Sequence, residues 1–173
     1  MGSGKSCVGR KAAQQLDFQF VDTDELIERR MGKTISDIFA RYGESFFRDL
    51  EKHVMREFAG RSRLVIATGG GSVLADDNWG NWRRNGIIIL LDVDAETACQ
   101  RTRHHGHRPL LQGTDALVRI KTLLAQRAGR YAKADAVVDT VGRTCEEVVD
   151  LVLKRYEEQA ARIARLKSST KEK

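Results

Sequence analysis

The stretch Gly2-Ser3-Gly4-Lys5-Ser6 decides how the rest of this chain is interpreted. It matches the second half of the phosphate-binding pattern G-x-x-x-x-G-K-[ST]. The glycines let the backbone curl, so that successive N–H groups form a cradle for an anion where a helix begins. Lys5 would then reach the β- and γ-phosphates, and the hydroxyl of Ser6 would bind Mg²⁺. A flexible N-terminus rich in small residues is the alternative at this point.

Half of that pattern is not in this sequence. Its opening glycine would fall upstream of Met1, and so would the strand that normally leads into the loop. The five residues are therefore weak evidence by themselves, and their meaning depends on the motifs further along the chain.

Short apolar segments alternate with helical patterns along the chain. Strands are predicted at 18–21, 64–68, 87–91 and 136–138. Helices are predicted at 8–16, 25–30, 35–42, 46–58, 95–102, 115–128 and 145–166. Continuous apolar strands separated by helices indicate an α/β fold, in which helices cover both faces of a parallel sheet. The polar segment 103–114 interrupts this alternation, and we expect it to be an exposed lid loop.

Composition bounds the class of protein. With 173 residues, 41% hydrophobic and 31% charged, the chain suits one soluble globular domain. No apolar run approaches the roughly 20 residues of a membrane helix, and the N-terminus lacks a signal-peptide pattern, so we expect a cytoplasmic protein. Three cysteines lie far apart in the sequence, and we expect them to be reduced, structural thiols: Cys7, Cys99 and Cys145.

The net charge of +6 resides mainly at the C-terminal end. Residues 162–173 carry five basic side chains and one acidic one. No aromatic residue interleaves with them to stack on bases, so a solvated end is favoured over a nucleic-acid-binding arm. Nucleic-acid binding through this tail is the weakest of the alternatives.

Two further stretches follow predicted strands, where open α/β sheets bind their ligands. Asp22-Thr23-Asp24 could hold Mg²⁺ and contact a substrate hydroxyl, or could merely cap the next helix. On extended chain an i, i+2 spacing points both carboxylates the same way, which favours a shared role. Gly69-Gly70-Gly71 indicates a close approach to the main chain, with a flexible turn as the alternative.

Four arginines are candidates for binding anionic ligands, because a planar guanidinium suits a carboxylate or a phosphate. Arg48 has apolar neighbours in the sequence and therefore needs an anionic partner. Arg127 lies late in a predicted helix, Arg101 ends another, and Arg108 lies in the expected lid. The nearby His104, His105 and His107 lack supporting ligands, so a metal site there is disfavoured.

Taken together, these features resemble the shikimate kinase family, a P-loop family of the nucleoside-monophosphate-kinase-like group. The resemblance covers residues 1 to about 152. Its markers in order are Gly2 to Ser6, Asp22-Thr23-Asp24-Glu25, Gly43-Glu44 followed by Phe47-Arg48, Ala67-Thr68-Gly69-Gly70-Gly71, Arg101-Thr102, Arg108-Pro109-Leu110-Leu111, and Arg127. The ordered combination is more specific than the phosphate-binding loop alone.

This resemblance implies an ATP-dependent kinase of aromatic amino-acid biosynthesis that phosphorylates the 3-hydroxyl of shikimate. The matching residues of the family imply that Lys5 stabilises the transferring phosphoryl group, that Asp24 binds substrate hydroxyls and accepts the proton, and that Arg108 closes onto the phosphates. Mg²⁺ would be held by Ser6 and, through water, by Asp22. The shikimate site would comprise Asp24, Arg48, Gly70, Gly71 and Arg127. The nucleotide site would comprise Gly2, Ser3, Gly4, Lys5, Ser6, Cys7, Arg101, Arg108 and Arg143.

The chain departs from the family pattern in two places. The first strand, a central element of the sheet, and the first glycine of the loop are missing. The family's Arg-x-Pro-Leu-Tyr segment reads Arg127-Ala128-Gly129-Arg130-Tyr131 here. Gly129 loosens the turn after Arg127, and Arg130 puts a charge where a leucine would pack.

We therefore expect a kinase domain at residues 1–152, with its lid at about 103–114, and an extended C-terminal helix and basic tail at 153–173. The expected partner is a small-molecule substrate, without nucleic acid or membrane, and the expected state is a monomer. Two alternatives remain: a kinase of another small hydroxy acid such as gluconate, and a non-catalytic nucleotide-binding module.

Overall fold

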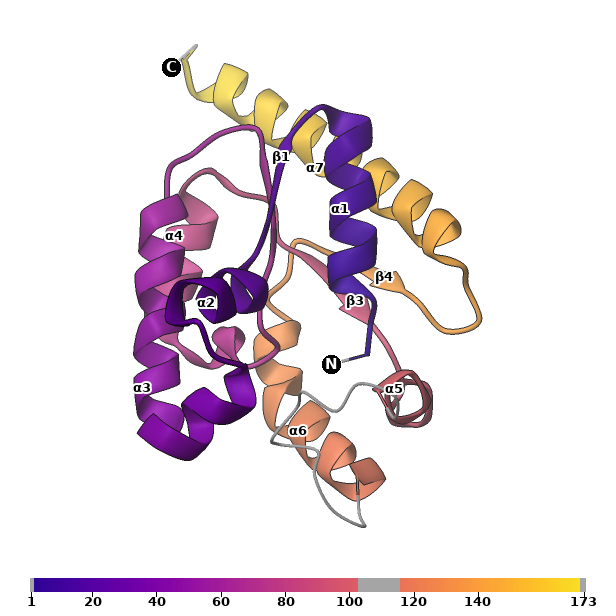
Figure 1. Ribbon diagram of the computed structural model, residues 1–173. Coiled ribbons are helices and arrows are strands. Elements are labelled where there is room, and N and C mark those ends of the chain that lie inside the picture. The colour runs from indigo at the N-terminus through magenta and orange to yellow at the C-terminus, as the bar shows by residue number, and fades with distance from the viewer. Residues whose placement is uncertain (1, 103–115, 172–173) are drawn as a thin grey trace.

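The computed structural model describes residues 2–102 and 116–171, in which helices and strands alternate (Figure 1). The elements are α1 (Lys5–Leu16), β1 (Gln19–Asp22), α2 (Thr23–Met31), α3 (Ile35–Phe58), β2 (Leu64–Ala67), the 3₁₀ helix η1 (Ser72–Leu74), α4 (Asp76–Asn85), β3 (Ile89–Asp92), α5 (Ala95–Thr102), α6 (Ala116–Tyr131), β4 (Ala136–Asp139) and α7 (Cys145–Lys171). The predicted lid falls outside the described residues.

The strands are parallel, as the alternation predicts. β1 pairs with β2, with Gln19 opposite Leu64, and β3 pairs with β4, with Ile89 opposite Ala136. Parallel neighbours require a crossover, which α2 and α3 provide for the first pair, while α5 and α6 lie between the strands of the second. The α/β class is confirmed. Within the described residues, however, the strands form two separate two-stranded sheets.

This division leaves the strands less covered than a continuous parallel sheet would. Most residues of β2 and β3 are half-buried rather than buried. Each strand has one edge without a neighbouring strand in the described part of the chain. The resemblance places one more strand at the centre of the sheet, and among the described residues no strand joins the two pairs.

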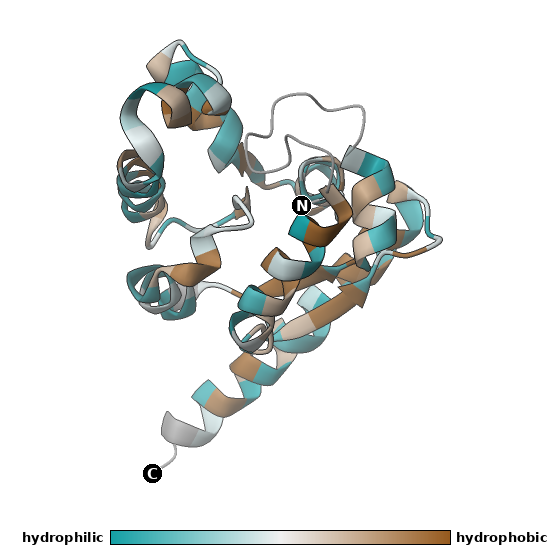
Figure 2. Ribbon diagram, turned by 90° about the horizontal axis from the view of Figure 1, so that it is seen from below, coloured by the Kyte–Doolittle hydropathy of each residue, from teal (hydrophilic) through white to brown (hydrophobic). Residues whose placement is uncertain are grey.

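Three hydrophobic clusters hold the elements together, and Figure 2 shows apolar residues along both strands and helices. The first joins α2 and α3 to β1 and β2 through Ile27, Ile38 and Phe47. The second joins α1 and α7 to β3 and β4, and the third joins α5 to α6. Because α1 contacts β1 and β2 on one side and α7 on the other, it lies between the two halves of the molecule.

Some elements differ from the sequence prediction, and others follow it closely. The sequence pattern does not predict helix α4, because Gly80 and a majority of polar or charged residues weaken its helical period. The two helices predicted before and after Gly43 both form within α3, where Gly43 has a non-helical backbone with φ 81° and ψ 170° and kinks the helix, as the prediction of two helices implied. The last helix continues to Lys171, and Tyr156 still packs edge-on against Phe18. The predicted boundary at residue 152 therefore lies within one continuous helix.

Among the described residues, none of the helices combines the length and the apolar character needed to span a bilayer.

The cysteine prediction was wrong for two of the three residues. Cys7, in the first turn of α1, forms a disulfide with Cys145, the first residue of α7, across 138 residues of sequence. Cys99 is free and buried, as expected. Sequence spacing could not reveal the pair, because the packing of α1 on α7 is what brings the two cysteines together.

This disulfide predicts a measurable dependence of stability on reductant. Closing so long a loop restricts the unfolded chain, so Cys145→Ala should lower the free energy of unfolding by about 2–4 kcal/mol without reductant. Urea denaturation followed by circular dichroism measures the change. Dithiothreitol should lower the midpoint of the parent protein and leave that of Cys145→Ala unchanged. An equal response of both proteins would contradict the prediction.

Candidate active site

The N-terminus of α1 forms an anion cradle. Gly4, its N-cap residue, has a φ of 82° and provides no capping side chain, so the first N–H groups of α1 stay available to a ligand. Gly2 also has positive φ, and a Cβ atom there would lie 2.8 Å from the backbone of Ala98 in α5. The side chain of Lys5 folds back on this loop, with its Nζ 3.4 Å from Ser3 Oγ. The geometry fits the predicted phosphate-binding loop.

The two predicted magnesium ligands meet beside this cradle. The Ser6 hydroxyl lies 2.5 Å from Asp22 Oδ2, at the end of β1. The other oxygen of Asp22 caps α2 by accepting from the backbone N–H groups of Asp24 and Glu25 at 3.0 and 3.3 Å. Asp22 therefore both caps a helix and faces Ser6. Hydroxyl and carboxylate oxygens suit Mg²⁺, which commonly uses one or two carboxylates together with substrate phosphates.

The expectation that Asp22 and Asp24 point the same way was wrong. Asp22 is the last extended residue, and the helix begins at Thr23, so the period-two rule for strands ends between the two aspartates. Asp22 faces Ser6, whereas Asp24 lies against the glycine turn. A Cβ atom on Gly69 would be 2.8 Å from Asp24 Oδ1. The pair thus divides between the phosphate side and a second, neighbouring site.

The triple glycine forms the floor of this second site because two side chains of α3 approach it closely. A Cβ atom on Gly71 would lie 2.6 Å from Arg48 Cζ, and one on Gly69 would lie 2.5 Å from Glu51 Oε1. Side chains at these positions would displace the guanidinium or the carboxylate. The prediction of a close approach to the main chain is confirmed, in preference to a merely flexible turn.

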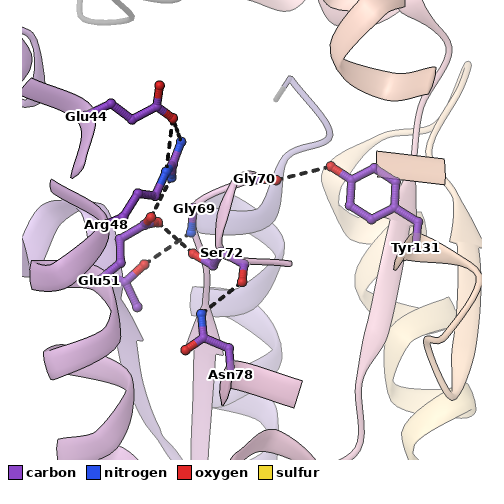
Figure 3. Close-up of polar contacts among 9 residues, drawn as sticks. Glu44, Arg48, Glu51, Gly69, Gly70, Ser72, Asn78 and Tyr131 are labelled. Atoms are coloured by element: carbon purple, nitrogen blue, oxygen red, sulfur yellow. Dashed lines mark hydrogen bonds and ion pairs between the residues drawn. The ribbon is translucent and has the colours of Figure 1, made fainter. Parts of the chain in front are cut away.

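A charged network positions Arg48 over this turn (Figure 3). Its guanidinium donates to Glu51 at 2.5 Å and to Glu44 at 2.7 Å. The Glu51 side chain is only 2% exposed and also accepts from the Ser72 hydroxyl at 2.6 Å. Burial lowers the pKa of Arg48, but the charge of Glu51 and the hydrogen bonds that Arg48 donates to both glutamates raise it by more, and the net effect is an increase. Arg48 is therefore a fixed cation.

Arg127 supplies a second buried cation on α6. The residue is 3% exposed, and its Nε atom has no hydrogen-bond partner among the described residues. The helix that carries it reaches the glycine turn, since the Tyr131 hydroxyl donates to the Gly70 carbonyl at 3.4 Å (Figure 3). A buried guanidinium without an internal anion is costly, so this position favours an anionic ligand.

The predicted nucleotide-side arginines gather at the loop after β4. Arg101 donates to the backbone and hydroxyl oxygens of Thr140 at 2.7 and 3.1 Å, and to the Gly2 carbonyl at 3.3 Å. Arg143 donates to the Asp139 carbonyl at 3.0 Å from the same loop. Arg101 therefore contacts the cradle, and Arg143 lies on the loop that Arg101 also contacts. Arg108 falls outside the described residues, together with the three histidines of the lid segment.

Sequence reasoning missed the partners that hold Arg48, above all Glu51. The signal was present, because Glu51 interrupts a buried stripe of α3 formed by Phe47, Val54 and Phe58. A glutamate at an apolar position, three residues after an arginine, indicates a buried ion pair. The hydrogen bond from Asn78 Nδ2 to the Ser72 carbonyl could not be inferred, since it depends on how α4 packs.

Comparison with known proteins agrees with this geometry. The family model described as shikimate kinase matches residues 1–157. A shikimate kinase of Gloeobacter violaceus is 47% identical over 165 residues, covering 93% of each chain, and one of Thermodesulfovibrio yellowstonii is 44% identical over 157 residues, covering 91% of each. A solved shikimate kinase from Acinetobacter baumannii, in complex with shikimate, superposes with a TM-score of 0.88 at 34% identity, over 92% of this chain and 89% of its own.

The matched range, residues 1–157, spans the phosphate cradle, the aspartates, the glycine turn and the arginines described above. These similarities establish what the sequence resemblance implied: this chain belongs to the shikimate kinase family.

Proposed function

We propose that this protein transfers the γ-phosphoryl group of ATP to the 3-hydroxyl of shikimate, with its carboxylate held between Arg48 and Arg127. The acceptor assignment rests on two guanidiniums, one from α3 and one from α6. These are the two helices that contact the glycine turn. Two carboxylates, Glu44 and Glu51, already pair with the single charge of Arg48, whereas Arg127 has no such partner among the described residues. The guanidinium of Arg127 is therefore the group that favours a ligand with one carboxylate.

Asp24 is the proposed proton acceptor for the substrate hydroxyl. It lies in the first turn of α2, beside Gly69 and close to the phosphate side through its neighbour Asp22. A carboxylate there can orient the hydroxyl and take its proton as the phosphoryl group transfers. The Gly70 and Gly71 backbone would border the ring of the substrate, because no side chains extend from these positions.

The cradle of Gly2 to Ser6 and Cys7 would hold the triphosphate, with the first N–H groups of α1 and the Lys5 ammonium facing its charge. Ser6 and Asp22 would hold Mg²⁺, which supplies neutralisation of the charge that develops on the phosphate oxygens. Arg101 and Arg143 would border the adenine, since both are anchored at the loop after β4. The closing role of Arg108 stays a prediction, as do a cytoplasmic location and a monomeric state.

A coupled ATPase assay with Mg²⁺ tests the acceptor. Shikimate should stimulate ADP release, and phosphorus NMR of the product should show a monophosphate ester at the 3-hydroxyl. Turnover of gluconate without turnover of shikimate would reject the acceptor, and ATP binding without turnover of either would favour a non-catalytic nucleotide-binding module. The assay should include a variant with an apolar strand of about six residues and Gly-x ahead of Met1, because the described strands have edges that are unpaired among the described residues.

The role of Asp24 predicts a specific kinetic loss. Asp24→Asn keeps the shape of the side chain but removes its basicity, so kcat should fall by roughly 10²-fold or more. Steady-state assays measure kcat and both KM values. Glu25→Gln, at the next residue of α2 and in an exposed ion pair with Arg10, is the matched control and should leave kcat near normal. Near-normal kcat in Asp24→Asn would refute the assignment.

The role of Arg48 predicts a selective effect on the acceptor. Loss of charged hydrogen bonds to a carboxylate should raise the KM for shikimate by roughly 10- to 100-fold in Arg48→Ala, with little change in the KM for ATP. Arg48→Lys, which keeps a cation beside Glu51, separates this effect from the cost of leaving a buried carboxylate unpaired. Arg41→Ala, on the exposed surface of the same helix, is the control. A larger effect on the KM for ATP would move Arg48 to the nucleotide side.

A further inference from the structure

The last turn of α6 is built differently in this chain from the family pattern. Where the family has proline and leucine between the binding arginine and the tyrosine, this chain has Gly129 and Arg130. Glycine is a weak helix former, and a charged residue cannot pack as leucine does. Something else must therefore fix this turn, because Arg127 lies at its start and needs a defined position to bind an acceptor.

Two side chains of this turn provide the anchors. Arg130 forms an ion pair with Asp76, the first residue of α4, and the Tyr131 hydroxyl donates to the Gly70 carbonyl at 3.4 Å. Both residues follow Arg127 by three and four positions, so they share its face of the helix. The hydrogen bond and the charge of the Arg130 guanidinium lower the pKa of Asp76, as expected of a carboxylate in an ion pair.

The helix α4 is itself fixed to the floor of the acceptor site. Asn78 donates to the Ser72 carbonyl and Trp79 donates to the Val73 carbonyl, each at 2.8 Å. Asn78 and Trp79 are 1% and 7% exposed, so these bonds are shielded from water. Ser72 also donates to Glu51, which accepts from Arg48. Arg48 is therefore connected to α4 through Glu51, Ser72 and Asn78, and α4 is connected to Arg130 through Asp76.

We propose that Arg130 is a positioning residue: its ion pair with Asp76 fixes the last turn of α6 on α4 and so sets Arg127 opposite Arg48 for the acceptor carboxylate. This inference rests on the proposed function. An ion pair to α4 thus takes the place of the turn that proline and leucine define in the family pattern. Arg130 is not catalytic, because it acts through Arg127 and touches neither substrate in this arrangement.

Reversing the charge of Arg130 or of Asp76, and then of both together, tests the proposal. Arg130→Asp and Asp76→Arg should each raise the KM for shikimate by roughly threefold to tenfold, because a displaced Arg127 binds the carboxylate less well. The KM for ATP should stay within about twofold of the parent value. The double variant Asp76→Arg/Arg130→Asp restores an opposite-charge pair and should recover most of the lost affinity. Arg130→Met removes the charge without introducing repulsion and should show the smaller increase.

Two controls make the result specific. Lys121→Asp reverses a charge on the same helix that pairs with Glu96 of α5, and should not change the KM for shikimate. With the methyl ester of shikimate, which lacks the anionic carboxylate, parent and Arg130→Asp should have equal KM values. An effect on the ester as large as that on shikimate would show a general loss of structure and would overturn the proposal.

The outcomes also separate this inference from the proposed function. If the parent protein phosphorylates shikimate and Arg130→Asp behaves like Lys121→Asp, only the positioning role is overturned. A double variant that is no better than the single variants would also overturn it. If the parent protein does not phosphorylate shikimate, the acceptor assignment fails, and the positioning role fails with it.

Discussion

The buried ion pair between Arg48 and Glu51 is the constraint on which the acceptor site depends. It places a guanidinium and a carboxylate directly against the backbone of Gly71 and Gly69, where a Cβ atom would not fit. Removing either partner would leave a buried charge uncompensated, so the pair and the glycines are interdependent. Glu51 also accepts from Ser72, and the same contact therefore defines both the orientation of Arg48 and the course of the turn.

The two halves of the molecule contribute different groups to the candidate site. β1 and β2, with α2 and α3, supply Asp22, Asp24 and Arg48, whereas α5 and the end of β4 supply the groups expected around the nucleotide base. The helix α1 contacts β1, β2 and α7, and its first turn is the phosphate cradle. The phosphates would therefore lie where the two halves meet, which is where a phosphoryl group must pass from one ligand to the other.

Local patterns predicted the class of fold and picked out most of the residues that the structure brings together in the candidate site, because strand alternation, glycine runs and motif spacing are properties of short segments. The same reasoning failed where tertiary packing decides. Helix α4 has a weak helical pattern and is held by Asn78 and Trp79 bonding to η1. The Cys7–Cys145 disulfide joins residues that only the packing of α1 on α7 brings together. The two aspartates diverge because a helix begins between them, and sequence spacing alone does not locate that boundary to one residue.

The unpaired strand edges have a consequence for how this chain behaves in concentrated solution. A free edge presents a row of backbone N–H and C=O groups that can pair with extended backbone from another molecule. The half-buried Leu64, Val65 and Ile66 of β2 would add apolar contacts to such pairing. Self-association of residues 1–173 would therefore start at the strand edges that are unpaired among the described residues rather than at the charged helices.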